Sequence, residues 1–319
     1  MTRTERGNAA QIPPRNSAGL KAFRQLAPDN RLALAVLNRR LAALPAGVPH
    51  TLILGLTRRC QLRCAHCRYL QPPYNGPVPP DMSPALARRA LRLAAAAGIP
   101  RIIFFGGEPT LYARLPELVR EAAGLGLFAE MDTNGLLLLD PRLLRRLRAA
   151  GLAAVRISLH AAGRAAHDAL AGPGTFDKAG KALKAARRAG LLVYLSSCVF
   201  SGSGGGRLPG LLRFAKASGA HGVRLLPYSG APGAAFHPAA LFTKVKAASP
   251  DRYARTCLSG GTGACAAAAR EILYIDQRGA IKSCPYSGRT LGSIKTASLA
   301  PVLRRRRTGR ALFPCRQAA

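Results

Sequence analysis

A regular alternation of apolar runs and helix-like segments starts at residue 51 and constrains the fold more than any other feature. The strand-like runs occupy residues 51–56, 101–105, 127–132, 154–159, 191–199 and 222–227. Helix-like segments lie between them, at residues 83–97, 112–124, 140–150, 175–189 and 207–218. Several end in glycine, as helices often do: Gly98, Gly151, Gly190 and Gly219. Six strands alternating with five helices predict an α/β fold with a parallel sheet, and six units are too few for a closed eightfold barrel. We therefore expect a curved, open (β/α)6 sheet, which is a partial barrel.

Three cysteines follow the first strand-like run. Cys60, Cys64 and Cys67 stand in the spacing Cys-x3-Cys-x2-Cys. Loops at the carboxyl ends of parallel strands carry the functional residues of such folds, so we expect this loop on the functional face. Three thiolates can hold three corners of a cubane iron–sulfur cluster and leave the fourth iron without a protein ligand, whereas zinc sites favour four protein ligands. The loop predicts a metal centre with one open coordination position.

The second strand-like run ends in Gly106-Gly107-Glu108-Pro109. Two adjacent glycines let a backbone approach a ligand closely, and Glu108 adds an acceptor for a cationic amine. A tight turn explains such a segment equally well when it stands alone. Its place one strand after the cysteine loop favours a binding function.

The two motifs in this order resemble those of the radical S-adenosylmethionine (SAM) superfamily, and the resemblance covers about residues 51–228. It implies a (β/α)6 core in which Cys60, Cys64 and Cys67 ligate a 4Fe–4S cluster, with the SAM amino and carboxylate groups on the open iron. It also implies reductive cleavage of SAM to a 5′-deoxyadenosyl radical that abstracts hydrogen from an unactivated carbon.

The same resemblance implies a set of SAM contacts. They are Gly106, Gly107, Glu108, Pro109, Asn134, Ser158, His66 and the backbone near Leu225. His66 departs from the family, which often has an aromatic residue before the third cysteine. For His160, a structural hydrogen bond and a contact with SAM or substrate both remain open. Cys198 is expected to pack in the fifth strand, and the alternative is a hydrogen-atom donor, as in some radical SAM epimerases.

Four further cysteines lie in the tail, at Cys257, Cys265, Cys284 and Cys315. Residues 271–285 alternate in the manner of a β-hairpin around Asp276-Gln277-Arg278-Gly279. The spacing Cys265-x13-Gly279-x4-Cys284 is similar to the opening of SPASM and twitch extensions, which bind auxiliary iron–sulfur clusters. The resemblance implies one auxiliary 4Fe–4S cluster on Cys265, Cys284 and Cys315, with Cys257 as a fourth ligand. Zinc is the competing interpretation, because four cysteines suit both metals.

The predicted organisation has three parts. Residues 1–50 form an N-terminal extension with a disordered start followed by helices, residues 51–228 the radical SAM core, and residues 229–319 a small cysteine-rich α+β extension of SPASM or twitch type. No apolar stretch reaches transmembrane length and the N-terminus lacks the features of a signal peptide. Clustered cysteines without such a signal favour the reducing cytoplasm.

The substrate is the least determined property. The net charge of +34, from 48 Lys and Arg against 14 Asp and Glu, would attract nucleic acid, acidic peptides or anionic lipid. The basic residues are scattered, however, and the Ala, Arg, Gly and Pro content is typical of GC-rich coding sequences. We expect a peptide or protein substrate, as for a ribosomal-peptide maturase. RNA modification, small-molecule or cofactor biosynthesis and a non-catalytic binding role are the alternatives.

The maturase interpretation also implies partners. An electron donor such as flavodoxin or ferredoxin would reduce the cluster. About fifty residues precede the first strand, too few for the leader-binding domain of many maturases. We therefore expect either a separate leader-recognition protein or a substrate that needs none.

Overall fold

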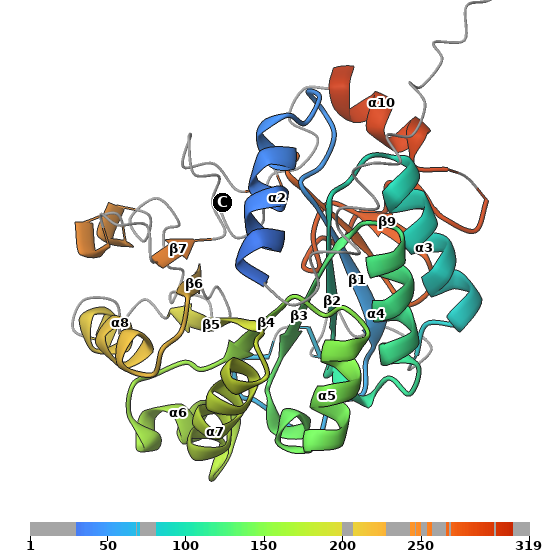
Figure 1. Cartoon of the computed structure of the whole chain (residues 1–319). Coiled ribbons are helices and arrows are strands. Elements are labelled where there is room, and N and C mark those ends of the chain that lie inside the picture. The colour runs from blue at the N-terminus through green and yellow to red at the C-terminus, as the bar shows by residue number, and fades with distance from the viewer. Residues whose placement is uncertain are drawn as a thin grey trace, which may run out of the picture.

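The computed structural model describes residues 30–67, 69–70, 81–199, 207–227, 243–245, 247–249, 254–256, 266–267, 269–296 and 298–308. In these segments ten strands form one sheet in the order β10-β9-β8-β1-β2-β3-β4-β5-β6-β7. The central strands are β1 (Thr51–Thr57), β2 (Arg101–Gly106), β3 (Phe128–Thr133), β4 (Ala154–Ser158), β5 (Leu192–Val199) and β6 (Gly222–Pro227). Each pairs in parallel with the next, which confirms the predicted parallel sheet (Figure 1).

Helices connect successive strands in the predicted order. They are α3 (Pro84–Ala96), α4 (Leu115–Gly124), α5 (Pro141–Ala149), α7 (Thr175–Arg188) and α8 (Arg207–Ala217). The glycines that follow α3, α5, α7 and α8 have the positive φ angles of helix C-terminal caps: Gly98 at 76°, Gly151 at 102°, Gly190 at 78° and Gly219 at 75°. The fold is therefore the predicted α/β partial barrel.

Sequence analysis missed the helix α6 (Arg164–Ala171), which lies between β4 and α7. At eight residues it is too short to show a clear amphipathic repeat. Two short 3-10 helices, η1 (Pro109–Leu111) and η2 (Leu136–Leu139), follow β2 and β3. All three elements lie in loops at the carboxyl ends of strands, where the candidate site is built.

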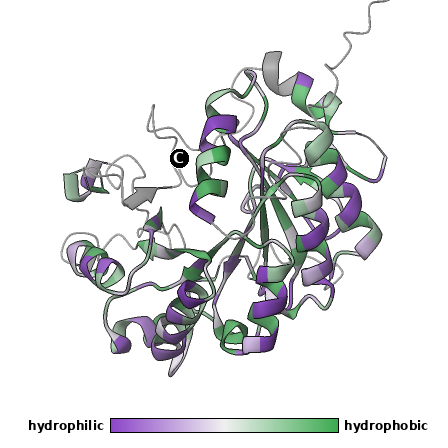
Figure 2. Cartoon of the chain, viewed as in Figure 1, coloured by the Kyte–Doolittle hydropathy of each residue, from purple (hydrophilic) through white to green (hydrophobic). Residues whose placement is uncertain are grey.

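The two faces of the sheet differ in what covers them. One face packs against α3, α4, α5, α7 and α8 through alternate strand residues: Leu52, Leu54, Phe104, Met131, Val155, Ile157, Val193, Leu195, Val223 and Leu225. The opposite face, called the inner face below, carries the residues between them, because side chains alternate along a strand. In Figure 2 the green apolar strands run between helices that turn purple residues outward.

Helix α2 (Asn30–Ala42) covers the inner face at the amino ends of the strands. Its Leu37 packs against Phe128, Ala154 and Leu192. Figure 1 shows α2 on the side of the sheet away from α3, α4 and α5. This packing closes the amino end of the inner face and leaves the carboxyl ends of the strands for the site.

The hairpin predicted for residues 271–285 is confirmed. Strand β8 (Ile272–Ile275) pairs antiparallel with β9 (Ala280–Lys282), and Gly279 in the turn has a φ of 83°. Strand β8 also pairs in parallel with β1, so the hairpin continues the central sheet beyond its first strand. The remaining elements are β10 (Gly292–Ser293), β7 (Ala254–Thr256) beside β6, and α10 (Ala300–Thr308). None of the described helices has the length and apolar character needed to cross a membrane.

Candidate active site

The cysteine loop follows β1 at the carboxyl edge of the sheet. Its three thiols are half-buried. The Cys67 backbone N–H donates to the Cys64 carbonyl at 3.0 Å, and the Ala65 N–H donates to the Leu170 carbonyl of α6 at 2.9 Å. The loop is thus closed by a turn and fixed to the helix that sequence analysis missed.

The thiols lie close enough to influence one another. Burial, followed by the charges of Cys67 and Cys60, raises the pKa of Cys64 to about 11. Burial is also the main reason that the pKa values of Cys60 and Cys67 are raised. Thiolates in such a place need a positive charge beside them, which metal binding supplies. Three soft sulfur ligands in one loop fit an iron–sulfur cluster, and Cys60, Cys64 and Cys67 are the residues that would hold it.

The two glycines after β2 serve the packing of this loop. A Cβ atom on Gly106 would lie 2.3 Å from the carbonyl oxygen of Thr57, and one on Gly107 would lie 2.3 Å from that of Arg59. The Gly107 N–H donates to the Thr57 carbonyl at 2.7 Å, and the Glu108 N–H donates to the Arg59 carbonyl at 2.8 Å. Only glycine permits this approach, which fixes the backbone leading into Cys60.

Glu108 is fully buried and joins the ends of two strands. Its Oε1 accepts hydrogen bonds from the Thr110 hydroxyl at 2.6 Å, the Thr110 N–H at 3.1 Å and the Thr133 hydroxyl at 2.8 Å. Its Oε2 accepts from the Asn134 N–H at 2.8 Å. Burial raises the pKa of Glu108, although these hydrogen bonds act in the opposite direction. Sequence analysis missed Thr110 and Thr133, whose only signal was their position beside the two motifs.

The remaining predicted SAM contacts lie on the same edge. Asn134 follows β3, and its Nδ2 lies 3.9 Å from the Cys60 sulfur. Pro109 begins η1 directly after Glu108, and Ser158 is the last residue of β4. The Leu225 side chain faces the helices, so only its backbone is available to a ligand. Glu108, Asn134 and Cys60 are thus brought together directly, and the other positions lie on neighbouring strand ends.

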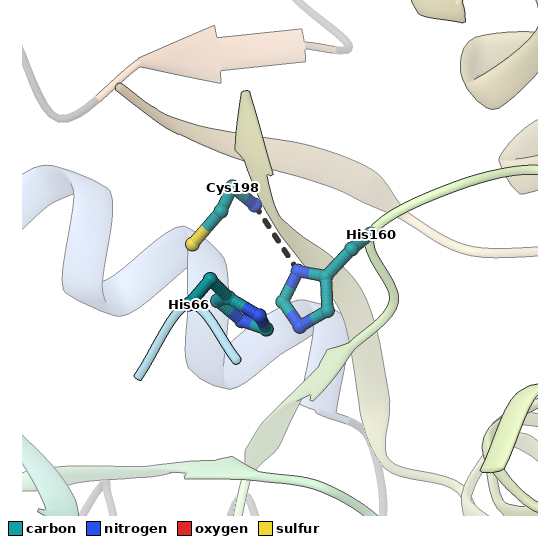
Figure 3. Close-up of side chains that lie close together, drawn as sticks. All are labelled: His66, His160 and Cys198. Carbon is teal, nitrogen blue, oxygen red and sulfur yellow. Dashed lines mark hydrogen bonds between the residues drawn. The ribbon is translucent and has the colours of Figure 1, made fainter. Parts of the chain in front are cut away.

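His66, His160 and Cys198 form a second group on this edge (Figure 3). The rings of His66 and His160 meet edge to face with centroids 4.1 Å apart. The Cys198 N–H donates to His160 Nδ1 at 3.2 Å, and the His160 N–H donates to His167 Nδ1 at 3.1 Å. The structural hydrogen bond considered for His160 is therefore present. Because Nδ1 accepts, the proton of a neutral His160 is on Nε2.

Burial keeps these histidines neutral. It lowers the pKa of His66 to about 4 and that of His160 well below its ordinary value, and the neighbouring imidazoles contribute in the same direction. One ligand atom each from His66, His160 and Cys198 lies within 4.8 Å of the others, a spacing that a metal ion could bridge. The His160 Nδ1 is already engaged by the Cys198 backbone, which leaves only its Nε2 as a ligand atom.

An aromatic cluster lines the inner face beside the cysteine loop. The Tyr69 and Tyr274 hydroxyls lie 2.9 Å apart, and the Phe105 ring packs edge to face on Tyr69. Tyr286 packs against the same cluster. Its pKa is raised, first by burial and then by the charges of the Cys198 and Cys67 thiolates. Tyr286 therefore connects the hairpin segment with the cysteine loop, a contact that the sequence pattern did not reveal.

The predicted auxiliary site is only partly within the described residues. Cys284 is half-buried, two residues before Tyr286, and its thiolate also acts on the Tyr286 hydroxyl. Cys257, Cys265 and Cys315 lie outside the described residues. The auxiliary site therefore stays a prediction.

Comparison with known proteins identifies the family. The model of the radical SAM superfamily matches residues 54–215, slightly more than half of the chain. The chain belongs to the radical SAM superfamily of enzymes, as the cysteine and glycine motifs predicted.

Two curated relatives show which members of the superfamily this chain resembles in sequence. A PqqA peptide cyclase of Xanthomonas campestris pv. campestris is 34% identical over 177 residues, which is 56% of this chain and 46% of the relative. An AdoMet-dependent heme synthase of Oleidesulfovibrio alaskensis is 32% identical over 145 residues, which is 45% of this chain and 37% of the relative. The alignments thus cover less than half the length of these curated relatives.

Solved structures share the fold. Streptococcus suis SuiB bound to S-adenosylmethionine has a TM-score of 0.65 at 18% identity, over 80% of this chain and 65% of that one. SuiB bound to its precursor peptide SuiA has a TM-score of 0.66 at 17% identity, over 95% and 73%. At this identity the likeness establishes the architecture alone.

Proposed function

We propose that this chain binds a 4Fe–4S cluster through Cys60, Cys64 and Cys67, and SAM beside it, in order to modify a peptide by radical chemistry. The observation that carries the proposal is the direct connection of the cysteine loop to buried Glu108 through the Gly106-Gly107 backbone. The chemistry supplied by the bound cluster and SAM would be one-electron cleavage of the sulfonium to a 5′-deoxyadenosyl radical, which takes hydrogen from the substrate.

The protein's own residues would orient these groups. Glu108 Oε2 accepts one hydrogen bond from Asn134, and a carboxylate oxygen has room for a second donor such as the SAM ammonium. Asn134 and Ser158 offer further polar contacts at neighbouring strand ends, and His66 offers a neutral ring face to the adenine. Buried Tyr69 and Tyr274, with half-buried Phe105 packed against them, would keep water from the inner face.

A peptide substrate is supported by two comparisons. One relative is named a PqqA peptide cyclase, and SuiB has been solved with its precursor peptide. The net charge of +34 suits an acidic peptide. We further propose one auxiliary cluster on Cys257, Cys265, Cys284 and Cys315, reduction by a flavodoxin or ferredoxin, a separate leader-recognition protein, and action in the reducing cytoplasm.

A small-molecule substrate is the second candidate, because another relative is named an AdoMet-dependent heme synthase. The peptide and small-molecule functions differ in the ligand that should bind at the inner face. A peptide substrate should protect the inner face from chemical labelling at Tyr286, in the presence of SAM, when an acidic peptide is added. A small-molecule enzyme should show no such protection.

The decisive experiment measures SAM cleavage and iron together. Anaerobically reconstituted protein reduced with dithionite should form 5′-deoxyadenosine, and Cys60→Ser should abolish its formation. About four irons per chain would indicate one cluster and about eight would indicate the auxiliary cluster as well. Cys198→Ser is the control for cysteine loss and should keep the full iron content. Normal 5′-deoxyadenosine formation by Cys60→Ser would refute the proposal.

A further inference from the structure

Helix α6 connects the cysteine loop with the surface of the molecule. Its Leu170 carbonyl accepts a hydrogen bond from the Ala65 N–H at 2.9 Å, and the Cys64 sulfur lies 4.0 Å from the Ala171 carbonyl. Ala65 is nevertheless exposed, as is Arg63 in the same loop, and Cys64 is only half-buried. A protein that covered α6 and this loop would therefore come close to the residues proposed to hold the cluster.

A row of basic residues on α7, called the α7 basic stripe below, begins beside α6. Its members are all exposed: Lys178, Lys181, Lys184 and Arg188. Only three residues separate the end of α6 from the start of α7, and the two helices pack together (Figure 1). Arg164 of α6 lies 2.9 Å from Asp177, and Asp177 shares one side of α7 with Lys181, four positions further on. The amino-terminal end of the stripe therefore lies next to α6.

The carboxylates of α6 and α7 are already engaged in other contacts. Asp168 accepts hydrogen bonds from the Gly174 and Phe176 N–H groups, both at 2.8 Å, and so holds the first turn of α7. Asp177 pairs with Arg164. Residues 164–188 contain six Lys and Arg against these two Asp, so the surface of the two helices is positive. Like charges three or four positions apart destabilise a helix by ~0.2–0.5 kcal/mol per pair, and an anionic partner would relieve this repulsion.

The composition of the chain does not account for the stripe. No lysine stands between Lys21 and Lys178, whereas α7 then has three within seven residues. Lysine codons are rich in adenine, so the GC-rich coding that explains the scattered arginines disfavours lysine. The basic residues of α3 also differ from the stripe, because Arg88 and Arg92 pair with Glu121 of α4. The α7 basic stripe is therefore a feature of its own.

We propose that the exposed cysteine loop, α6 and the amino-terminal end of the α7 basic stripe form the docking surface for an acidic one-electron carrier protein, of the flavodoxin or ferredoxin class. This inference rests on the proposed function. At this surface the carrier would be oxidised by one electron and the cluster reduced by one, with no bond made or broken.

Two physical requirements favour this partner. Electron transfer slows steeply with distance, so a donor has to lie against the loop that holds the cluster, and α6 touches that loop. Transient redox complexes have small interfaces that are assembled by complementary charge, so a few exposed cations are sufficient. The inner face stays available to the substrate, because the carrier would approach from the side of α6 and α7.

The test follows reduction of the reconstituted, SAM-loaded protein by reduced flavodoxin, using stopped-flow absorbance of the cluster. Lys178→Glu/Lys181→Glu should lower the second-order rate constant about tenfold at low salt, and much less at high salt, because salt screens exposed charges. Reduction by dithionite, which needs no protein docking, should keep the wild-type rate. Arg39→Glu/Arg120→Glu makes the same change in net charge at exposed positions of α2 and α4 and should keep the flavodoxin rate.

Three results would overturn the proposal. They are an unchanged flavodoxin rate in Lys178→Glu/Lys181→Glu, an equal loss in Arg39→Glu/Arg120→Glu, and an equal loss with dithionite. Binding of a 20-nucleotide uridine RNA is measured on the same proteins. Weaker RNA binding by Lys178→Glu/Lys181→Glu, with an unchanged flavodoxin rate, would assign the stripe to nucleic acid instead.

Formation of 5′-deoxyadenosine with dithionite separates this inference from the proposed function. A wild type that cleaves SAM with dithionite, but whose reduction by flavodoxin does not depend on Lys178 and Lys181, refutes the docking surface alone. A wild type that does not cleave SAM with dithionite refutes the proposed function itself.

Discussion

At the scale of single residues, Glu108 is a structural junction as well as a candidate ligand. Its carboxylate receives four hydrogen bonds from Thr110 in η1, Thr133 at the end of β3 and Asn134 directly after β3. Buried acceptors with this many donors are costly to alter, because each donor left without an acceptor loses its solvation as well. Glu108 therefore fixes the geometry of the site before any ligand binds.

Glu108→Gln should destabilise the protein even without SAM. An amide nitrogen cannot accept, so either the Thr110 and Thr133 donors or the Asn134 N–H loses its partner. We expect a loss of ~1–3 kcal/mol in the free energy of unfolding, measured with urea. Glu121→Gln is the matched control, because Glu121 pairs with Arg88 and Arg92 at the surface and should change stability by less than ~1 kcal/mol. Equal losses in both variants would contradict the assigned role.

The rings of His160 and His167 are stacked with centroids 5.5 Å apart, and these two histidines predict that the stability of the protein depends on pH. The pKa values of His160 and His167 are lowered in the folded chain, chiefly by burial, from an ordinary value of 6.5. The unfolded chain therefore binds more protons as the pH falls below about 6.5, and stability is lost on acidification at ~1.4 kcal/mol per unit of pKa depression. Above that pH both states are neutral and the contribution is complete.

The measurement is urea unfolding of cluster-free protein between pH 7.5 and 5. His160→Gln should lose less stability over this range than the wild type, since a glutamine does not titrate while its amide oxygen can still accept from the Cys198 N–H. Arg145→Gln, at an exposed position of α5, leaves every histidine in place and should follow the wild type. The interpretation fails if all three proteins lose stability in parallel.

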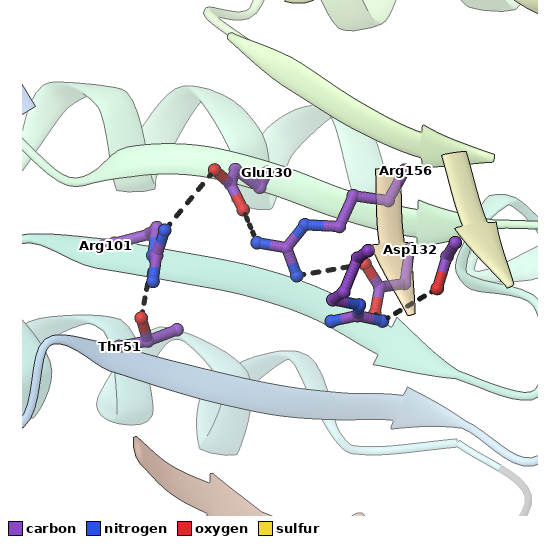
Figure 4. Close-up of polar contacts among 7 residues, drawn as sticks. Thr51, Arg101, Glu130, Asp132 and Arg156 are labelled. Carbon is purple, nitrogen blue, oxygen red and sulfur yellow. Dashed lines mark hydrogen bonds and ion pairs between the residues drawn. The ribbon is translucent and has the colours of Figure 1, made fainter. Parts of the chain in front are cut away.

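Only some of the site residues could be identified in sequence. Cys60, Cys64 and Cys67 are revealed by spacing within one loop, and Glu108 by its place after the glycines. Thr133 and Tyr286 contact these residues through the register of neighbouring strands and the position of the hairpin, neither of which leaves a local pattern. The inner-face ion pairs of Glu130 and Asp132 with Arg101, Arg156 and Arg224 were missed for the same reason, because these residues are separated by whole strands and helices (Figure 4).

At the scale of elements, apolar periodicity and glycine caps predicted the six central strands and five of the helices between them. The short α6 escaped because eight residues carry little periodic signal. The parallel pairing of β8 with β1 escaped for a different reason. More than two hundred residues of sequence separate β8 from β1, so their pairing is set by tertiary packing and not by local preference.

Helix α2 is the element whose packing is most easily tested. Leu37 is 1% exposed and packs against Phe128, Ala154 and Leu192, whereas Leu32 in the same helix is 43% exposed. Leu37→Ala should lower the free energy of unfolding by ~2–5 kcal/mol through lost contacts and a cavity. Leu32→Ala should change it by less than ~0.5 kcal/mol. Similar values for the two variants would show that α2 does not close the inner face.

At the scale of the whole molecule, two distributions of charge must be separated. The +34 net charge is spread along the sequence and acts over long distances through solvent, where salt screens it. The ion pairs of Arg156 with Glu130 and Asp132 on the inner face involve side chains that are only 4% to 14% exposed, so salt screens them far less. RNA attracted by the net charge should therefore dissociate steeply as salt is added, and binding titrations at low and high salt measure this; an RNA affinity that does not depend on salt would contradict it.

The hairpin and the central sheet share one core, which has a consequence for unfolding. Ile281 of β9 is fully buried in the same apolar cluster as Leu52 and Leu91, although it lies in the predicted C-terminal extension. Ile281→Ala should lower stability by ~2–5 kcal/mol and should shift a single transition seen alike by far-UV circular dichroism and tyrosine fluorescence. Lys295→Ala, at an exposed position near β10, should leave that transition in place. Two separate transitions, with Ile281→Ala shifting only one of them, would show instead that the extension folds as a unit of its own. A single transition is expected because β8 is hydrogen-bonded to β1 along four residue pairs, so the edge of the sheet cannot open without exposing the first strand and the cysteine loop that follows it.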